Sequence, residues 1–265
     1  MGDARVRSSV TAVVDTIAWQ WGEIDAMRVG DEVHLAHRHG RARLSVRDGR
    51  LVRGEGYAEA SPEARRDLAR VGAIVRLRQR GRYLVHAAGA VDPEGRAWLL
   101  AGDSGCGKSS LGYALARAGW TSLGDDGVLI ESVDDGFRAH AWRESLKVSV
   151  ALASEFPELH TDAARARRSD PRQRISLSVP MATTGARVAA VVFLARSDRH
   201  SIRRLGQVAA LGALVRQSPW VIIEDSYSRP HLDVLRRVAS LPVFHLEHTP
   251  AELHTIDRVL TEAVA

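Results

Sequence analysis

The sequence predicts an α/β fold in which a small β-rich N-terminal segment, residues 1–60, precedes a larger domain of mixed strands and helices, residues 61–265. Two observations support this organisation. Short β-prone stretches separated by turn residues dominate the first segment, whereas strand and helix candidates are mixed in the second. In the second segment, a glycine-rich loop lies between an apolar strand candidate and a helix candidate, which is the order that a phosphate-binding loop requires.

The N-terminal segment is expected to form antiparallel hairpins. The dipeptides His39-Gly40 and Asp48-Gly49 separate short alternating stretches, which is a typical hairpin signal. A helix is predicted to start after Ser61, because a serine N-cap is followed by a proline and an acidic residue, and to reach residue 70 or beyond. The strand candidates are residues 33–36, 42–46 and 51–53.

The second segment contains strands and helices in mixed order. An apolar stretch at 83–88, a turn at 92–95 and a buried strand at 97–101 lead into the glycine-rich loop at 102–107. Gly119 is expected to end the helix that follows the loop. The remaining strand candidates are 120–123, 128–130, 188–194 and 221–223, the helix candidates are 108–118, 208–216, 231–239 and 251–263, and residues 161–175 are expected to be a polar loop.

The composition excludes several classes of protein. The chain has 265 residues, of which 45% are apolar, so it can form one large core or two small ones. The single cysteine, Cys106, excludes an internal disulfide. No apolar run reaches the ~20 residues of a membrane span and no signal peptide is evident, so a cytoplasmic location without a membrane partner is expected. The net charge of +5 comes from arginines spread along the chain, so nucleic acid is not an expected partner.

Residues 102–109 read Gly-Asp-Ser-Gly-Cys-Gly-Lys-Ser and match the P-loop pattern G-x-x-x-x-G-K-[ST] at every fixed position. The glycines let main-chain N–H groups turn toward a phosphate, and the following helix adds the positive end of its dipole. Lys108 is expected to reach the β- and γ-phosphates, and Ser109 to bind Mg²⁺. The cofactors expected are therefore ATP and Mg²⁺, and the nucleotide-binding candidates are Asp103, Ser104, Gly105, Cys106, Gly107, Lys108, Ser109 and Ser110.

Asp125 and Asp126 are the candidate acids of the site. They follow the P-loop helix and a short strand, so they are expected at a strand end beside the loop. One carboxylate would bind the metal while the other accepts a hydroxyl proton. The alternative is a simple turn, since glycines flank the pair on both sides. A hydrolase would instead place Glu224 or Asp225 beside the P-loop, after the apolar stretch 221–223.

These residues together resemble the HPr kinase/phosphorylase superfamily of bacterial serine kinases. The resemblance covers roughly residues 83–130, and residues 241–246 resemble the last strand of smaller HPr-kinase-like proteins. It implies a P-loop kinase core of the HPr kinase C-terminal type. The matching stretches are His86-Ala87-Ala88-Gly89, the P-loop, Gly119-Trp120 and Leu123-Gly124-Asp125-Asp126.

The resemblance also implies roles for the matched residues. Asp125 would be the catalytic base that accepts the proton of the substrate serine, and His86 would lie beside the acids and the γ-phosphate. Asp126 would support the metal or orient His86. An arginine-rich stretch further along the chain offers Arg172 and Arg174 as ligands of the γ-phosphate or of an acidic peptide.

The chain departs from the full-length family pattern in two ways. Its N-terminal part is shorter, and the Glu-Ile-Arg-Gly-Leu-Gly signature after the Asp pair is absent. The nearest counterpart of the signature contains Glu144, a candidate second metal ligand. The chain is more similar to short HPr-kinase-like proteins, some of which phosphorylate ribosomal precursor peptides.

The expected partner is therefore a peptide or small protein that carries a serine, such as a lasso-type precursor peptide. The resemblance also allows a homo-oligomer, since HPr-kinase relatives often form one. The alternatives are a kinase of a small-molecule hydroxyl, a P-loop ATPase and a regulatory nucleotide-binding module.

Overall fold

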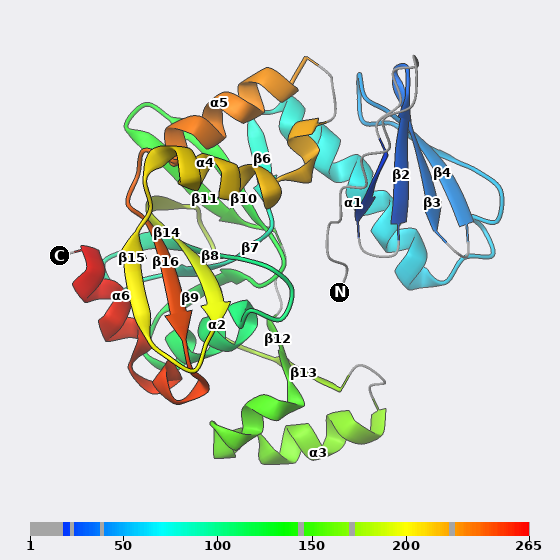
Figure 1. Ribbon diagram of the computed structural model, residues 1–265. Helices are drawn as coiled ribbons and strands as arrows, with labels where there is room; N and C mark the ends of the chain where they lie inside the picture. Colours follow the sequence, from blue (N-terminus) through cyan, green and yellow to red (C-terminus); the bar gives the residue numbers. More distant parts are fainter. Residues whose placement is uncertain are drawn as a thin grey trace. The chain divides into compact units, whose positions relative to one another are not determined.

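The computed structural model describes residues 18–21, 24–37, 40–142, 146–169, 173–222 and 226–264 (Figure 1). The chain divides into two compact units. The first comprises Met1–Leu84 and Ser218–Leu235, and the second comprises Val85–Gln217 and Arg236–Ala265. Each unit is therefore built from two separate segments of the chain. Among the described residues, no helix combines the length and the apolar character needed to cross a membrane.

The first unit contains a five-stranded antiparallel sheet in which the strands follow one another in sequence order. Apolar side chains alternate along β2 to β4 and bury one face of the sheet, as the hairpin pattern predicts. The three predicted strands are confirmed. The strands are β1 (Ala18–Trp21), β2 (Ile24–Val29), β3 (Glu32–His37), β4 (Gly40–Ser45) and β5 (Leu51–Arg53).

Helix α1 (Pro62–Gln79) begins where the sequence predicts, because the Ser61 hydroxyl accepts the N–H of Ala64 at 3.2 Å. Its apolar residues recur at helical spacing and are buried, and the helix contacts β3 and β4. A boundary after residue 60 would separate this helix from the sheet, whereas in the structure it lies within the first unit. The first of the unit's two chain segments ends inside β6 (Arg82–Val85).

The strand predicted at 221–223 is not found in the two residues of this stretch that the structure describes. Pro219–Ile222 forms a 3₁₀ helix, η3, in which the Val221 N–H donates to the Ser218 carbonyl at 3.0 Å. A short apolar run with a proline in front suits a tight helical turn as well as a strand, so its composition did not distinguish the two. Helix α5 (Ser228–Val238) follows and matches the helix predicted at 231–239.

The second unit is built on a sheet of mixed direction. Strand β8 is parallel to β14, β14 is parallel to β16, and β7 is antiparallel to both β8 and β9. Strands β10, β11 and β15 continue the sheet as antiparallel neighbours. The bounds are β7 (Ala87–Val91), β8 (Arg96–Ala101), β9 (Thr121–Gly124), β10 (Val128–Val133), β11 (Gly136–Ala141), β14 (Ala186–Arg196), β15 (Ser201–Arg204) and β16 (Val243–His248).

Helices and short pieces pack around this sheet. Helix α2 contacts β7, the short strand β12 and helix α6, and its apolar residues join one hydrophobic core with the sheet. Helix α4 matches its prediction, and the predicted helix at 251–263 is a 3₁₀ turn, η4, followed by α6. The bounds are α2 (Lys108–Arg117), β12 (Leu146–Ser149), η1 (Val150–Ser154), η2 (Pro157–Leu159), α3 (His160–Ser169), β13 (Arg174–Leu177), α4 (Gln207–Arg216), η4 (Pro250–Thr255) and α6 (Ile256–Val264).

The polar loop predicted at 161–175 is wrong for most of its length, because His160–Ser169 forms helix α3. Ala163 and Ala166, one helical turn apart, are buried, and the helix contacts η1. Two small apolar residues among many charged ones are a weak signal in sequence. Packing against η1 stabilises a helix that the composition alone does not predict.

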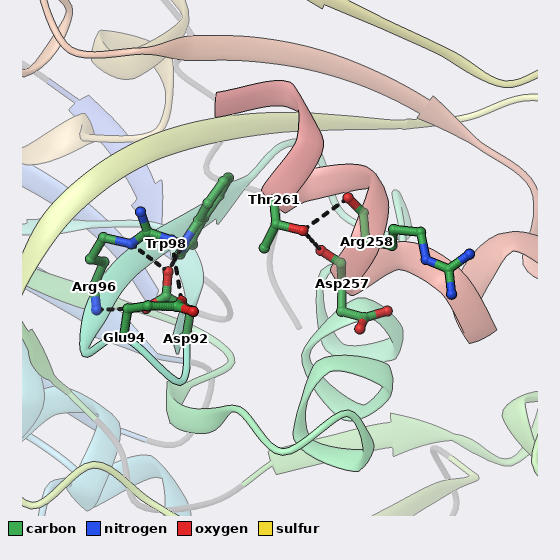
Figure 2. A network of polar contacts seen from close by, with 7 residues as sticks. All are labelled: Asp92, Glu94, Arg96, Trp98, Asp257, Arg258 and Thr261. Carbon is green, nitrogen blue, oxygen red and sulfur yellow. Dashed lines mark hydrogen bonds and ion pairs between the residues drawn. The ribbon is translucent and has the colours of Figure 1, made fainter. Parts of the chain in front are cut away.

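The turn predicted at 92–95 joins β7 to β8 and is closed by the buried carboxylate of Asp92 (Figure 2). This carboxylate accepts the main-chain N–H of Arg96 at 2.7 Å, its Nε at 2.8 Å and the Nε1 of Trp98 at 3.0 Å. The Asp92 side chain is 0% exposed. The contacts fix the hairpin whose second strand leads directly into the glycine-rich loop.

Candidate functional site

The strand directions bring several predicted site residues to one edge of the second unit's sheet. Strands β8, β14 and β16 are parallel, and β9 runs the same way because both it and β8 are antiparallel to β7. Their carboxyl ends and the start of β7 therefore share an edge, where open α/β sheets bind ligands. The residues at this edge are His86 before β7, Gly102 after β8, Asp125 after β9, Arg196 at the end of β14 and His248 at the end of β16.

The main chain of residues 102–107 forms a concave loop in front of α2. Gly102, Gly105 and Gly107 have φ values of 139°, 83° and 106°, which favour glycine. A Cβ on Gly107 would lie 2.8 Å from the ring of His248, so the loop is also too tightly packed there for a side chain. The first N–H groups of α2 have no acceptor within the helix. Such a loop followed by a helix N-terminus suits a phosphate.

Lys108 is buried within the loop. Its ammonium donates to the carbonyl oxygens of Gly102 at 2.6 Å and Asp103 at 3.1 Å. An ammonium has three N–H donors, so these two contacts leave one donor for a phosphate bound in the loop. Ser109 and Ser110 lie half-buried in the first turn of α2, directly after the lysine.

Cys106 has its side chain inside the loop region and is 8% exposed. Burial raises the pKa of its thiol, which keeps the thiol protonated. Because the thiolate is the nucleophilic form, this environment does not suit covalent catalysis by Cys106.

The carboxylate of Asp125 is held by contacts with Lys147 and Arg174. It accepts the main-chain N–H of Lys147 at 2.9 Å and lies 3.7 Å from Nη2 of Arg174. Arg174 also donates to the Lys147 carbonyl, and its side chain is 11% exposed. Asp125 itself is 3% exposed. Arg174, predicted as a phosphate ligand, is thus brought to the acid by the pairing of β12 with β13.

The turn that carries Asp125 and Asp126 is also part of the site. Gly124 has a φ of 104°, and the Ser122 hydroxyl accepts its N–H at 3.0 Å. The turn interpretation and the site interpretation of this sequence are therefore compatible, because the turn directs a buried carboxylate to the sheet edge. Asp126 follows it and is half-buried.

His86 is placed by the ladder between β7 and β8. Ala87 pairs with Ala101, so His86 and Gly102 are next to each other at the end of that ladder. The His86 N–H donates to the Gln217 carbonyl at 2.7 Å, and the residue is half-buried. The histidine, the P-loop and the acid pair thus belong to neighbouring strands.

Several predicted residues lie outside the part of the chain that the structure describes. These are the metal candidate Glu144, the phosphate candidate Arg172, and the hydrolase candidates Glu224 and Asp225. Within the described residues, no group of three or more His, Cys, Asp or Glu side chains could hold a metal ion alone. Mg²⁺ is commonly held by one or two carboxylates together with substrate phosphates and water. Ser109 and Asp126 remain the described candidates.

Three contributors to this edge are not among the residues predicted from the sequence. They are Arg196, His248 and the main chain of Lys147. Arg196 follows the apolar stretch 188–195, and His248 ends the alternating stretch 243–248, so a strand signal existed near each of them. This signal identifies site residues only when the strand order is known, because the strand order determines which strand ends lie beside the P-loop.

Comparison with solved structures finds similarity to the HPr(Ser) kinase/phosphatase from Coxiella burnetii. The identity is 12% and the TM-score 0.38, over 68% of this chain and 93% of that chain. No family model matches this chain, and no curated protein matches it. Identity and TM-score are both low, so the assignment of function depends on the residues of the site.

Proposed function

We propose that this protein is an ATP- and Mg²⁺-dependent kinase that transfers the γ-phosphoryl group to a serine hydroxyl of a peptide or small protein. A ribosomal precursor peptide of the lasso type is the candidate acceptor that the sequence resemblance favours. Lys108 and the N–H groups of the loop bind the phosphates. Asp125 accepts the proton of the attacking hydroxyl, and His86 and Asp126 assist it.

The observation that supports this proposal is the shared sheet edge. A P-loop alone is compatible with any use of the γ-phosphate. Here the buried carboxylate of Asp125 follows β9, and only β7 separates β9 from β8, the strand that leads into the P-loop. The Lys147 N–H orients this carboxylate. Transfer of a phosphoryl group needs mainly positioning and charge neutralisation, which these groups supply. Bound Mg²⁺ would neutralise the charge that develops on the phosphate oxygens.

The ATPase alternative places Glu224 or Asp225 beside the P-loop, after the short apolar stretch 221–223. The described part of that stretch belongs to η3 and not to a strand, and residues 223–225 lie outside the described residues. The same site would serve a small-molecule hydroxyl, and only an acceptor assay separates that case.

The test is incubation of the purified protein with ATP, Mg²⁺ and a panel of acceptors, followed by intact-mass measurement and a free-phosphate assay. The panel contains a precursor peptide that ends in serine, the same peptide with alanine in its place, and HPr. We expect a phosphate-sized mass gain on the serine peptide alone. A gain on HPr would identify a different protein substrate. Steady release of phosphate without any gain would replace the proposal with an ATPase.

A further inference from the structure

The imidazole of His248 contacts the P-loop although 142 residues separate the two in sequence. The residue ends β16, is 3% exposed, and has its ring Nε2 3.0 Å from the carbonyl oxygen of Cys106. Its Nδ1 lies 3.4 Å from the carbonyl of Thr249. The ring also lies against Gly107, where a Cβ would come within 2.8 Å of it.

The contact has a defined direction. Both ring nitrogens face carbonyl oxygens, which only accept, and a neutral imidazole has one N–H. We assign the hydrogen to Nε2, because its contact with the Cys106 carbonyl, at 3.0 Å, is shorter than the 3.4 Å contact of Nδ1. In a trans peptide, the carbonyl and the next N–H point in opposite directions. A hydrogen bond that holds the Cys106 carbonyl toward His248 therefore turns the Gly107 N–H away from the ring.

We propose that His248 is a positioning residue of the nucleotide site, which acts through the Cys106 carbonyl to aim the Gly107 N–H at the bound phosphate. The inference rests on the proposed nucleotide binding and identifies a determinant of it outside the P-loop motif. Gly107 has a φ of 106°, and because glycine has no Cβ, the peptide group before it can rotate more freely than the peptide group before another residue. An external donor removes that freedom before the nucleotide binds, which lowers the cost of binding.

The test compares two variants at this position. His248→Gln keeps an N–H donor of similar reach, and His248→Met fills similar space without a donor. Affinity for a non-hydrolysable ATP analogue with Mg²⁺, measured by calorimetry, is expected to fall about tenfold in the Met variant and less than about threefold in the Gln variant. The KM for ATP should follow the affinity, whereas the KM for the acceptor should stay unchanged. His200→Gln is the matched control, because His200 pairs with Glu252 and not with the P-loop.

Nitrogen-15 spectra of the wild-type protein test the same inference without a substitution. We expect hydrogen on Nε2 of His248, and a Gly107 amide resonance that moves in His248→Met but not in His200→Gln. Equal affinities for the Met variant and the wild type, or equal losses in the Met and Gln variants, would overturn the role of the donor. A spectrum that shows no hydrogen on Nε2 of His248 would also overturn this role. That measurement uses the wild-type protein, so it tests the proposal even if the Met variant does not fold.

Failure of the wild type to bind the nucleotide would remove the proposed kinase function. The ring tautomer and the Gly107 resonance would still show whether His248 orients the loop. The two proposals therefore fail on different measurements.

Discussion

At the scale of single residues, the chemistry of the site is concentrated in a few groups with unusual surroundings. Only two of the 37 basic residues are lysines, and one of them, Lys108, is buried in the P-loop. Asp125 is a buried acid that is held by a main-chain N–H and a nearby guanidinium. Burial of charged groups is costly unless partners compensate for it. The partners of Asp125 supply this compensation and orient the carboxylate.

Asp125→Asn is expected to abolish phosphoryl transfer and to leave ATP binding within about twofold of the wild type. The amide has nearly the same shape as the carboxylate, so the loop keeps its geometry, but it cannot accept the hydroxyl proton. Transfer is measured by intact mass and binding by calorimetry. Asp134→Asn, in the exposed turn between β10 and β11, is the control. Near-wild-type transfer by Asp125→Asn would show that another group is the base.

At the scale of elements, local sequence signals predicted the boundaries well where the signal and the packing agree. Ser61 caps α1, and the Asp-Gly turn joins β4 to β5, because a few neighbouring residues determine these conformations. The local signals did not predict elements whose conformation depends on tertiary packing. Helix α3 forms on two buried alanines, and the apolar stretch at 219–222 folds into η3.

The hairpin of β7 and β8 gives a test at this scale. Asp92→Ala removes an acceptor from a buried network and leaves the Trp98 N–H without its partner. We expect the free energy of unfolding to fall by about 2–4 kcal/mol, as urea denaturation would measure. Asp134→Ala, at an exposed turn, is expected to change it by less than about 0.5 kcal/mol. Equal effects of the two variants would contradict a specific role of the Asp92 network.

At the scale of the whole molecule, each compact unit is assembled from two segments that are distant in sequence. In the first unit, His231 from the second segment stacks on Tyr83 from the first, with ring centroids 4.7 Å apart. His231 is 0% exposed, and neither ring nitrogen has a hydrogen-bond partner among the described residues. Burial, and next the charge of Arg78, lower the pKa of His231 from 6.5 to about 3.

This histidine makes the stability of the first unit depend on pH. Between pH 6.5 and about 3, the unfolded chain binds a proton at His231 that the folded chain does not. The free energy of unfolding should therefore fall as the pH decreases through this range, by up to about 1.4 kcal/mol per pH unit from this group. His231→Phe, which keeps an aromatic ring against Tyr83, should show a shallower dependence in urea titrations from pH 7.5 to 4.5.

The control is Met27→Phe, because Met27 is 41% exposed and carries no titratable group. It should leave the slope of stability against pH as it is in the wild type. An unchanged slope in His231→Phe would mean that other groups carry the pH dependence.

The P-loop motif, with its lysine and serine, could be predicted from the sequence, because these residues are consecutive and the loop conformation depends on its own glycines and on the start of the next helix. The sequence also predicted the acid pair and His86 as candidates. Only the tertiary structure decided that these groups share a sheet edge with Arg174 and His248. That grouping depends on strand order and direction, which result from the burial of side chains far apart in the chain and from no local pattern.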